Sequence, residues 1–308
     1  MRLAVVTEAF GDRPLDAVLD CLAEAAPGID RLELGSGGYA VTAHCDRAAL
    51  LRDDRARSRW HEQIEARGFD IAALNAWGNP LHPDVEIARR HDRDLRETIL
   101  LASALGVDRV LALAGCPGDT RPRFAAGGWL PYLEGDHEHQ WQDSGGPYWS
   151  DLAAFARREH PGLVLCVELH PGTLVYDVDT FADLAAVGDN VAANLDPSHL
   201  FWMQMDPLVV VERLPRVGYA HLKDVVFDED RLAVSGVLDH RWRGDAVDGA
   251  WRFATVGRGH TAEWWRGFVA ALAARGIETA AIEHEDPLVA VEVGVAEASR
   301  VLTLAEAA

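Results

Sequence analysis

The chain has 308 residues, of which 49% are hydrophobic and 25% are charged, and this composition excludes a disordered protein. Asp and Glu number 49 against 29 Lys and Arg, so the formal net charge is −20, which argues against nucleic acid or an anionic membrane as a partner. No apolar run reaches the length that spans a bilayer, and residues 1–7 are typical of a short strand rather than of a secretory signal.

Short apolar runs rich in Val, Leu, Ile and Ala alternate with longer helical patterns along the whole chain. Most of the runs are continuous and do not alternate with polar residues, as expected for parallel strands that are buried on both faces. In chain order, the predicted strands are 3–7, 31–35, 71–76, 109–114, 163–169, 191–196, 217–222 and 279–283.

Helices are predicted between these strands from the spacing of apolar residues and from residues that favour helix ends. Pro14 fits a first turn, and we expect Asp46, Asp84, Asp179 and Thr261 to cap helix starts. Glycines at 68, 106 and 276 follow predicted helices and fit C-cap positions. The predicted helices are 14–26, 46–67, 84–105, 179–186, 261–275 and 289–304.

This alternation, without a linker or low-complexity stretch, predicts an α/β fold: one (β/α)8 barrel domain over residues 1–308. An open doubly wound sheet is the alternative, but no GxGxxG motif follows a strand. Two connections are long, 115–150 after the fourth strand and 224–260 after the seventh. Loops of that length in a compact domain are usually functional, so we expect both to act as lids.

The last four predicted strands each end in ionisable side chains, which a barrel brings to one face. Burying an ionised group without a partner costs on the order of several kcal/mol. A cation bound between several such groups would offset that cost. Carboxylates with an imidazole suit Mn²⁺, Mg²⁺, Co²⁺ or Zn²⁺. The segments concerned are Glu168-Leu169-His170, Asp196-Pro197-Ser198-His199, His221-Leu222-Lys223-Asp224 and Glu283-His284-Glu285-Asp286.

With these segments and the stretch Asn75 to Pro83, nearly the whole chain resembles the xylose isomerase-like barrels, also called sugar phosphate isomerases/epimerases. The resemblance implies that Glu168, Asp196, His221 and Glu283 hold one divalent metal ion, with Mn²⁺ as the first choice. It also implies an enzyme that moves a proton next to a carbonyl through a metal-stabilised enediolate. Glu168 and Glu283 would exchange the proton, and which of them is the base stays open.

The expected substrate is a keto-sugar or cyclitol without phosphate, because no Gly-rich phosphate cradle follows strands seven and eight. In the resemblance His199 contacts substrate oxygens near the metal. Further candidates for substrate binding, each with a structural alternative, are Asn75, Trp77, His82, His170, Lys223 and Arg258, and Arg241 is a second candidate beside Arg258. A second metal site at His137 and His139 is a weaker hypothesis, because HxH alone is an unspecific motif.

Loop pieces such as Gly115-Cys116-Pro117-Gly118-Asp119 and Pro147-Tyr148-Trp149 are similar to catalytic subunits of C-glycoside-cleaving enzymes. That resemblance implies an alternative function, a metal-dependent lyase or C-deglycosidase acting on 3-oxo-glycosides, with a small partner subunit. A DNA-repair endonuclease would need a basic groove, which the net charge of −20 argues against. A non-catalytic sugar-binding barrel is disfavoured because all four ligand positions are intact.

Cys21, Cys45, Cys116 and Cys166 are widely spaced and form no CxxC pair. We therefore interpret them as small buried side chains, and expect a cytoplasmic protein. The expected partner is a small-molecule sugar or glycoside, and a homo-oligomer would match related proteins. The exact substrate, its stereochemistry, the metal's identity and the oligomeric state stay open.

Overall fold

The computed structural model describes residues 1–11, 13–118, 136–239 and 248–306. Eight parallel strands close into a barrel in the order β1-β10-β7-β6-β5-β4-β3-β2, which confirms the predicted (β/α)8 fold. The barrel strands are β1 (Arg2–Val6), β2 (Ile29–Gly35), β3 (Asp70–Asn75), β4 (Arg109–Leu113), β5 (Val164–Glu168), β6 (Val191–Leu195), β7 (Val217–Leu222) and β10 (Thr279–Ile282).

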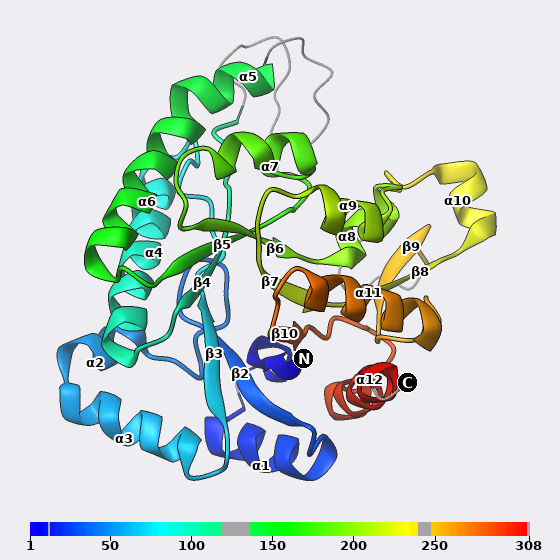
Figure 1. The fold of residues 1–308 in the computed structure, drawn as a ribbon, viewed down its shortest axis with the longest axis horizontal. Coiled ribbons are helices and arrows are strands. Elements are labelled where there is room, and N and C mark those ends of the chain that lie inside the picture. Colours follow the sequence, from blue (N-terminus) through cyan, green and yellow to red (C-terminus); the bar gives the residue numbers. More distant parts are fainter. Residues whose placement is uncertain (12, 119–135, 240–247, 307–308) are drawn as a thin grey trace.

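Helices surround this barrel (Figure 1). The N-terminal half carries α1 (Leu15–Ala25), α2 (Arg47–Arg52), α3 (Asp54–Glu65) and α4 (Val85–Leu105), with a 3₁₀ turn at Thr7–Phe10. The connection after β4 holds α5 (Asp136–Gln140), a π-helical turn η2 (Trp141–Gly145) and α6 (Gly146–Glu159). The C-terminal half carries α7 (Val178–Ala185), α8 (Pro197–Trp202), α9 (Pro207–Arg213), α10 (Glu229–Ser235), α11 (Ala262–Ala274) and α12 (Val291–Glu306).

The helix ends follow the local chemistry of the sequence. Asp46, Asp84 and Thr261 accept backbone N–H bonds at the starts of α2, α4 and α11, as expected. The predicted cap at Asp179 is wrong: the carboxylate of Asp177 accepts from Thr180 N, so the helix starts earlier. The predicted helix 46–67 is also wrong as one element, because Asp53 leaves the helical conformation and caps α3.

The long connection after β7 contains structure that its sequence did not predict. Strand β8 (Asp224–Phe227) pairs antiparallel with β9 (Trp251–Ala254), and α10 lies between them in the chain. In Figure 1 this ribbon and α10 project at one side of the barrel, next to α8. Residues 240–247 of this connection and 119–135 of the one after β4 lie outside the described residues, Arg241 among them.

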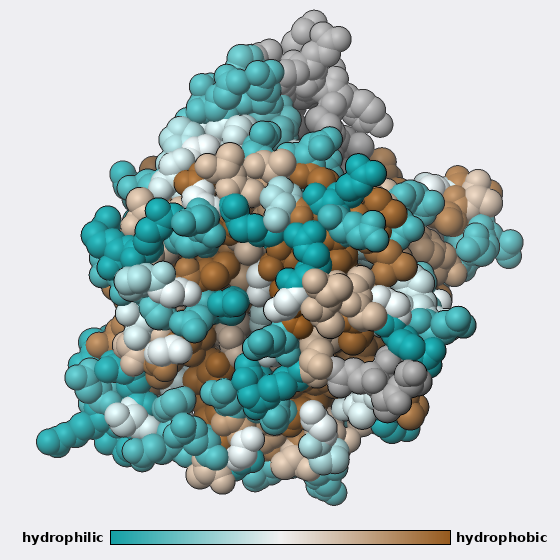
Figure 2. All heavy atoms as spheres, in the orientation of Figure 1, coloured by the Kyte–Doolittle hydropathy of each residue, from teal (hydrophilic) through white to brown (hydrophobic). Residues whose placement is uncertain are grey.

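The apolar core lies between the barrel and its helices, as continuous hydrophobic strands require. Large buried side chains such as Trp149 and Trp265 fill this layer. Figure 2 shows hydrophilic side chains spread over much of the viewed face, with hydrophobic ones between them. All four cysteines are free, and burial raises the pKa of Cys45 and of Cys166 to about 12, so both thiols stay protonated. Among the described helices, none is both long and apolar enough to cross a bilayer.

Candidate metal centre and active site

The four predicted ligands converge at the carboxyl ends of the barrel strands. Glu168 is the last residue of β5, His221 lies near the end of β7, and Glu283 follows β10 directly. Asp196 follows β6 and caps α8, because its Oδ1 accepts a hydrogen bond of 2.8 Å from Ser198 N. Each side chain is at least nine-tenths buried. The barrel thus collects at one point residues that are far apart in the sequence.

The imidazole of His221 lies at the centre of this group. Its Nδ1 is 3.5 Å from Glu168 Oε2 and 3.2 Å from Glu283 Oε2. One ligand atom each from Glu168, Asp196 and His221 lie within 4.8 Å of one another, close enough to share one ion. Glu168 and Glu283 therefore flank the same nitrogen, and both side chains also line the cavity described below.

Glu33, at the end of β2, is part of the site although the sequence analysis did not single it out. Its side chain is fully buried, and its Oε2 lies 3.0 Å from His221 Nε2. The other oxygen accepts a 2.8 Å hydrogen bond from Asn75 Nδ2. A carboxylate on one imidazole nitrogen fixes the ring and leaves the other nitrogen free to bind a metal. The sequence contains a signal for it: Glu33 lies between Leu32 and Leu34 near the end of a strand, as Glu168 lies between Val167 and Leu169.

Lys223 places a cation among the acidic side chains. Its Nζ lies 2.8 Å from Glu283 Oε2, 3.1 Å from Asp196 Oδ2 and 2.7 Å from Glu285 Oε2, and the side chain is 2% exposed. Burial lowers the pKa of Lys223, but the three carboxylates outweigh it and raise the pKa well above its ordinary value. Lys223 is therefore charged and pairs with two of the predicted metal ligands.

The protonation states of the other ligands follow from their neighbours. Burial raises the pKa of Glu168, but hydrogen bonds from His199 and His221 outweigh it, and the pKa lies well below the ordinary value. Burial also raises the pKa of Glu283, but the nearby Lys223 and then His221 lower this pKa to about 2. Burial lowers the pKa of His221, whereas Glu33 and Glu283 raise it far more. Both carboxylates are thus ionised at neutral pH.

A divalent cation fits this donor set. Asp196 Oδ2 is fully buried and lies near Lys223, yet it accepts no well-oriented hydrogen bond from any described residue. A buried carboxylate oxygen without such a bond is costly, and coordination by an ion removes that cost. Three carboxylates and one imidazole make an oxygen-rich site, which Mn²⁺ or Mg²⁺ accepts and Zn²⁺ or Co²⁺ tolerates.

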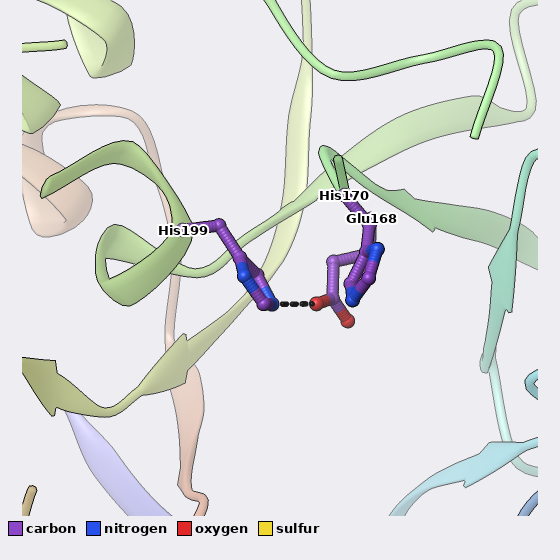
Figure 3. Close-up of side chains that lie close together, drawn as sticks. All are labelled: Glu168, His170 and His199. Atoms are coloured by element: carbon purple, nitrogen blue, oxygen red, sulfur yellow. Dashed lines mark ion pairs between the residues drawn. The ribbon is translucent and has the colours of Figure 1, made fainter. Parts of the chain in front are cut away.

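His199 and His170 also lie close to Glu168 (Figure 3). His199 Nε2 is 3.1 Å from Glu168 Oε1, and the rings of His170 and His199 are 4.3 Å apart. These three side chains form a second group close enough to share an ion. Burial, and then the nearby His199, lower the pKa of His170 to about 4, so His170 is neutral at physiological pH.

A cavity of about 480 Å³ opens above these groups. Its polar floor includes Glu168, His199, Lys223 and Glu283, with His170 and Glu285 beside them. Trp77 also lines it and packs edge-on against His221, with ring centroids 5.6 Å apart. A cavity of this size accommodates a small organic ligand.

Three of the residues proposed from sequence for substrate binding lie elsewhere. Asn75 is fully buried beneath Glu33 and does not line the cavity. His82 lies in the loop before α4, where its Nδ1 accepts from Asp84 N. Arg258 forms an ion pair with Glu297 near the surface. His137 contacts the carbonyl of Leu174, and no candidate metal group among the described residues includes it.

The chain matches the model of a known protein family over residues 31–303, and that model describes a xylose isomerase-like TIM barrel. It is also 33% identical, over 304 residues, to the uncharacterized protein YfiH of Bacillus subtilis (strain 168). The match covers 96% of each chain.

Solved structures share the fold at low sequence identity. The probable 3-DHS dehydratase AsbF of Bacillus anthracis superposes with a TM-score of 0.69 and 14% identity, covering 98% of this chain and 99% of that one. D-psicose 3-epimerase of Clostridium cellulolyticum H10, solved with D-tagatose, superposes with a TM-score of 0.66 and 14% identity. The match covers 100% of this chain and 99% of that one. At such identities the similarity establishes the barrel and not the reaction.

Proposed function

The chain belongs to the xylose isomerase-like TIM-barrel family, and from that premise we propose that it is a divalent-metal-dependent isomerase or epimerase of a keto-sugar or cyclitol. The observation that carries the proposal is the placement of Glu168 and Glu283 on either side of His221 Nδ1, at the floor of a cavity. An ionised carboxylate there can remove a proton from a carbon next to a carbonyl. Structural similarity to a D-psicose 3-epimerase agrees with this class of reaction.

Glu168, Asp196, His221 and Glu283 would hold the metal ion. When bound, the ion supplies Lewis acidity, which makes the C–H bond next to a carbonyl more acidic. Glu168 and Glu283 then act as the proton acceptor and donor, and their ionised state suits the acceptor's role. His199, beside Glu168 on the cavity floor, would bind a substrate oxygen.

Lys223 also faces the cavity and carries a positive charge. An ammonium at this position stabilises negative charge that develops on a substrate oxygen. Glu285, half exposed and 2.7 Å from Lys223 Nζ, holds the ammonium near the floor. We therefore propose that Lys223 contributes to substrate binding, one of the two roles that its place in the sequence suggested, beside its pairing with the carboxylates.

The lyase alternative begins with the same step. Elimination from a 3-oxo-glycoside also requires removal of a proton next to a ketone, so the arrangement of Glu168 and Glu283 serves both reactions. The dehydratase among the structural neighbours illustrates that this barrel carries eliminations as well. An assay of proton removal therefore tests the shared step first.

The test is deuterium exchange with purified, Mn²⁺-loaded protein in D₂O. Ketohexoses and 3-oxo-glucosides are incubated with the enzyme, and deuterium at the carbon next to the carbonyl is read by NMR. We expect exchange by the native protein, and a fall of about 10²–10⁴-fold in E168Q and E283Q because the proton acceptor or donor is lost.

The matched control is E86Q, because Glu86 lies on the exposed start of α4 and pairs only with Arg89 among the described residues. Exchange by E86Q should equal that of the native protein. Exchange that persists unchanged in both E168Q and E283Q would show that these carboxylates do not move the proton.

A further inference from the structure

The cavity has a polar floor, and one side of it is an apolar wall built by α8 and the connection after β7. Trp202 at the end of α8 and Trp251 and Phe253 of β9 line it, with Val237 and Leu238 after α10. All of these side chains except Leu238 belong to, or pack against, an apolar cluster that includes residues of the β8–β9 ribbon. Helix α8 and the connection after β7 thus build a hydrophobic surface beside the polar groups of the floor.

Contacts among the side chains of the wall hold them in place. The rings of Trp202 and Trp251 stack with centroids 4.6 Å apart and planes inclined by 12°. Trp251 Nε1 donates a 2.9 Å hydrogen bond to the carbonyl of Val237. The polar atom of Trp251 is therefore engaged within the wall, and the part of the ring that lines the cavity is apolar.

Phe253 joins the wall to the floor. Its ring lies 4.4 Å from Lys223 Nζ and packs edge-on against His199, with centroids 5.6 Å apart. A ligand whose reacting carbons face Glu168 and Glu283 would therefore extend any neighbouring substituent across Phe253 and Trp251. The apolar wall is therefore directly next to the polar floor, where the reacting carbons would lie.

A free monosaccharide fits such a wall poorly. It carries a hydroxyl group on nearly every carbon, and burying hydroxyls without hydrogen-bond partners is unfavourable. Among the described residues of the segment 237–253, Asp239 is the one ionisable side chain that lines the cavity. The wall therefore offers few polar partners, whereas an aromatic or alkyl group would gain from leaving water.

Resting on the function proposed above, we propose that the substrate is a keto-sugar that carries an apolar substituent of about the size of a phenyl ring. The sugar's carbonyl end lies on the floor, and the substituent lies against Trp202, Trp251 and Phe253. Leu238 covers the outer part of the substituent, because its side chain lines the cavity and is 49% exposed.

The test compares 3-oxo-glucose, its methyl glycoside and its phenyl glycoside with the Mn²⁺-loaded protein. Binding is measured by calorimetry, and proton removal by deuterium exchange in D₂O. Burial of a phenyl ring is expected to lower Kd at least about tenfold relative to the methyl glycoside, with a parallel fall in KM for exchange.

Two variants locate the effect. L238Q changes a half-exposed side chain and should reduce the preference for the phenyl glycoside about threefold or more, while binding of the methyl glycoside stays the same. W251L should reduce the preference further, because it removes the ring that stacks on Trp202. L288Q is the matched control, since Leu288 is 58% exposed and does not line the cavity.

The outcomes separate this inference from the proposed function. Equal Kd values for the methyl and phenyl glycosides overturn the inference, and exchange on either compound then still supports the function. Tenfold tighter binding of the phenyl glycoside without exchange on any compound supports the inference and contradicts the function. A preference that L238Q and W251L leave unchanged also overturns the inference, because the ring would then bind elsewhere.

Discussion

His221 shows how a single residue's role depends on a partner from the other side of the barrel. Glu33 and His221 are separated by most of the chain, yet their side chains meet at 3.0 Å in full burial. Glu33 in turn is held by Asn75. The pair fixes the orientation of the imidazole, so that Nδ1 faces Glu168 and Glu283.

Replacement of Glu33 by glutamine should therefore weaken metal binding. In E33Q the charge that orients and polarises His221 is lost, and we expect Mn²⁺ to bind about 10–100-fold more weakly. Calorimetric titration of the metal-stripped protein measures this change. E24Q, on the exposed face of α1, provides the comparison, and equal affinities of E33Q and E24Q would refute the role of Glu33.

His170 makes stability depend on pH. Burial and His199 depress its pKa to about 4, whereas the unfolded chain keeps the ordinary value of 6.5. As the pH falls from about 6.5 to 4, the unfolded state takes up a proton that the folded state does not, so stability decreases. Between pH 7 and pH 5 this one group should shift the unfolding equilibrium about twentyfold towards the unfolded state.

Urea unfolding in EDTA at pH 7 and pH 5 measures the effect. H170N removes the titrating group, so the loss of stability between the two pH values should be smaller in H170N than in the native protein. An identical loss in both proteins would show that His170 is not responsible.

At the scale of elements, Asp224 connects β8 to the loop that precedes α11. It is fully buried, and its Oδ2 accepts hydrogen bonds of 3.0 Å from the backbone N–H groups of Gly257, Gly259 and His260. Its Oδ1 contacts His260 Nδ1 at 2.7 Å. One carboxylate thus organises the return of the chain from the ribbon to the barrel.

Loss of this carboxylate should destabilise the protein strongly. D224A removes a buried carboxylate that three backbone N–H groups and His260 share, and we expect a decrease of about 3–5 kcal/mol in the free energy of unfolding. D228A is the comparison: Asp228 caps α10, a helix without buried residues, and its loss should cost about 1 kcal/mol. Urea denaturation followed by circular dichroism measures both, and a D224A cost no larger than that of D228A would contradict this account.

The helices and strands were predictable where the local sequence pattern agrees with the environment that the fold provides. All eight barrel strands coincide with predicted runs, most of which are continuous and apolar because both faces of a parallel strand are buried. The β8–β9 ribbon was not predicted, since Asp224–Phe227 and Trp251–Ala254 are short and their pairing joins residues distant in sequence. Likewise, α6 was not predicted: its first residues lie in the connection 115–150, and no element was expected over 151–159.

The site was predictable in part for the same reason. Glu168, Asp196, His221 and Glu283 each follow or end an apolar strand, so the barrel alone brings them together. Glu33 carries the same signal but lies on an early strand, away from the segments that carried the resemblance. The pairing of Lys223 with Asp196 and Glu283 depends on side-chain conformation, which residue spacing does not determine.

At the scale of the whole molecule, acidic residues exceed basic ones on the chain and also gather at the barrel's mouth. The three carboxylate ligands, Glu33 and Glu285 bring more negative charge to this point than Lys223 and His221 balance. Such a site attracts a divalent cation and is stabilised by it. The cytoplasmic location, the single domain, the oligomeric state and the absence of nucleic acid or membrane partners stay predictions.

The most direct test of the central claim is a metal titration of the EDTA-stripped protein, with deuterium exchange into 3-oxo-glucosides as the readout. We expect exchange to be absent without metal and to rise with Mn²⁺ until one ion is bound per chain, as counted by elemental analysis. D196N should need far more Mn²⁺ for the same exchange, because one ligand is lost. Full exchange by the stripped protein, unaffected by EDTA, would contradict the claim that these side chains work around one divalent ion.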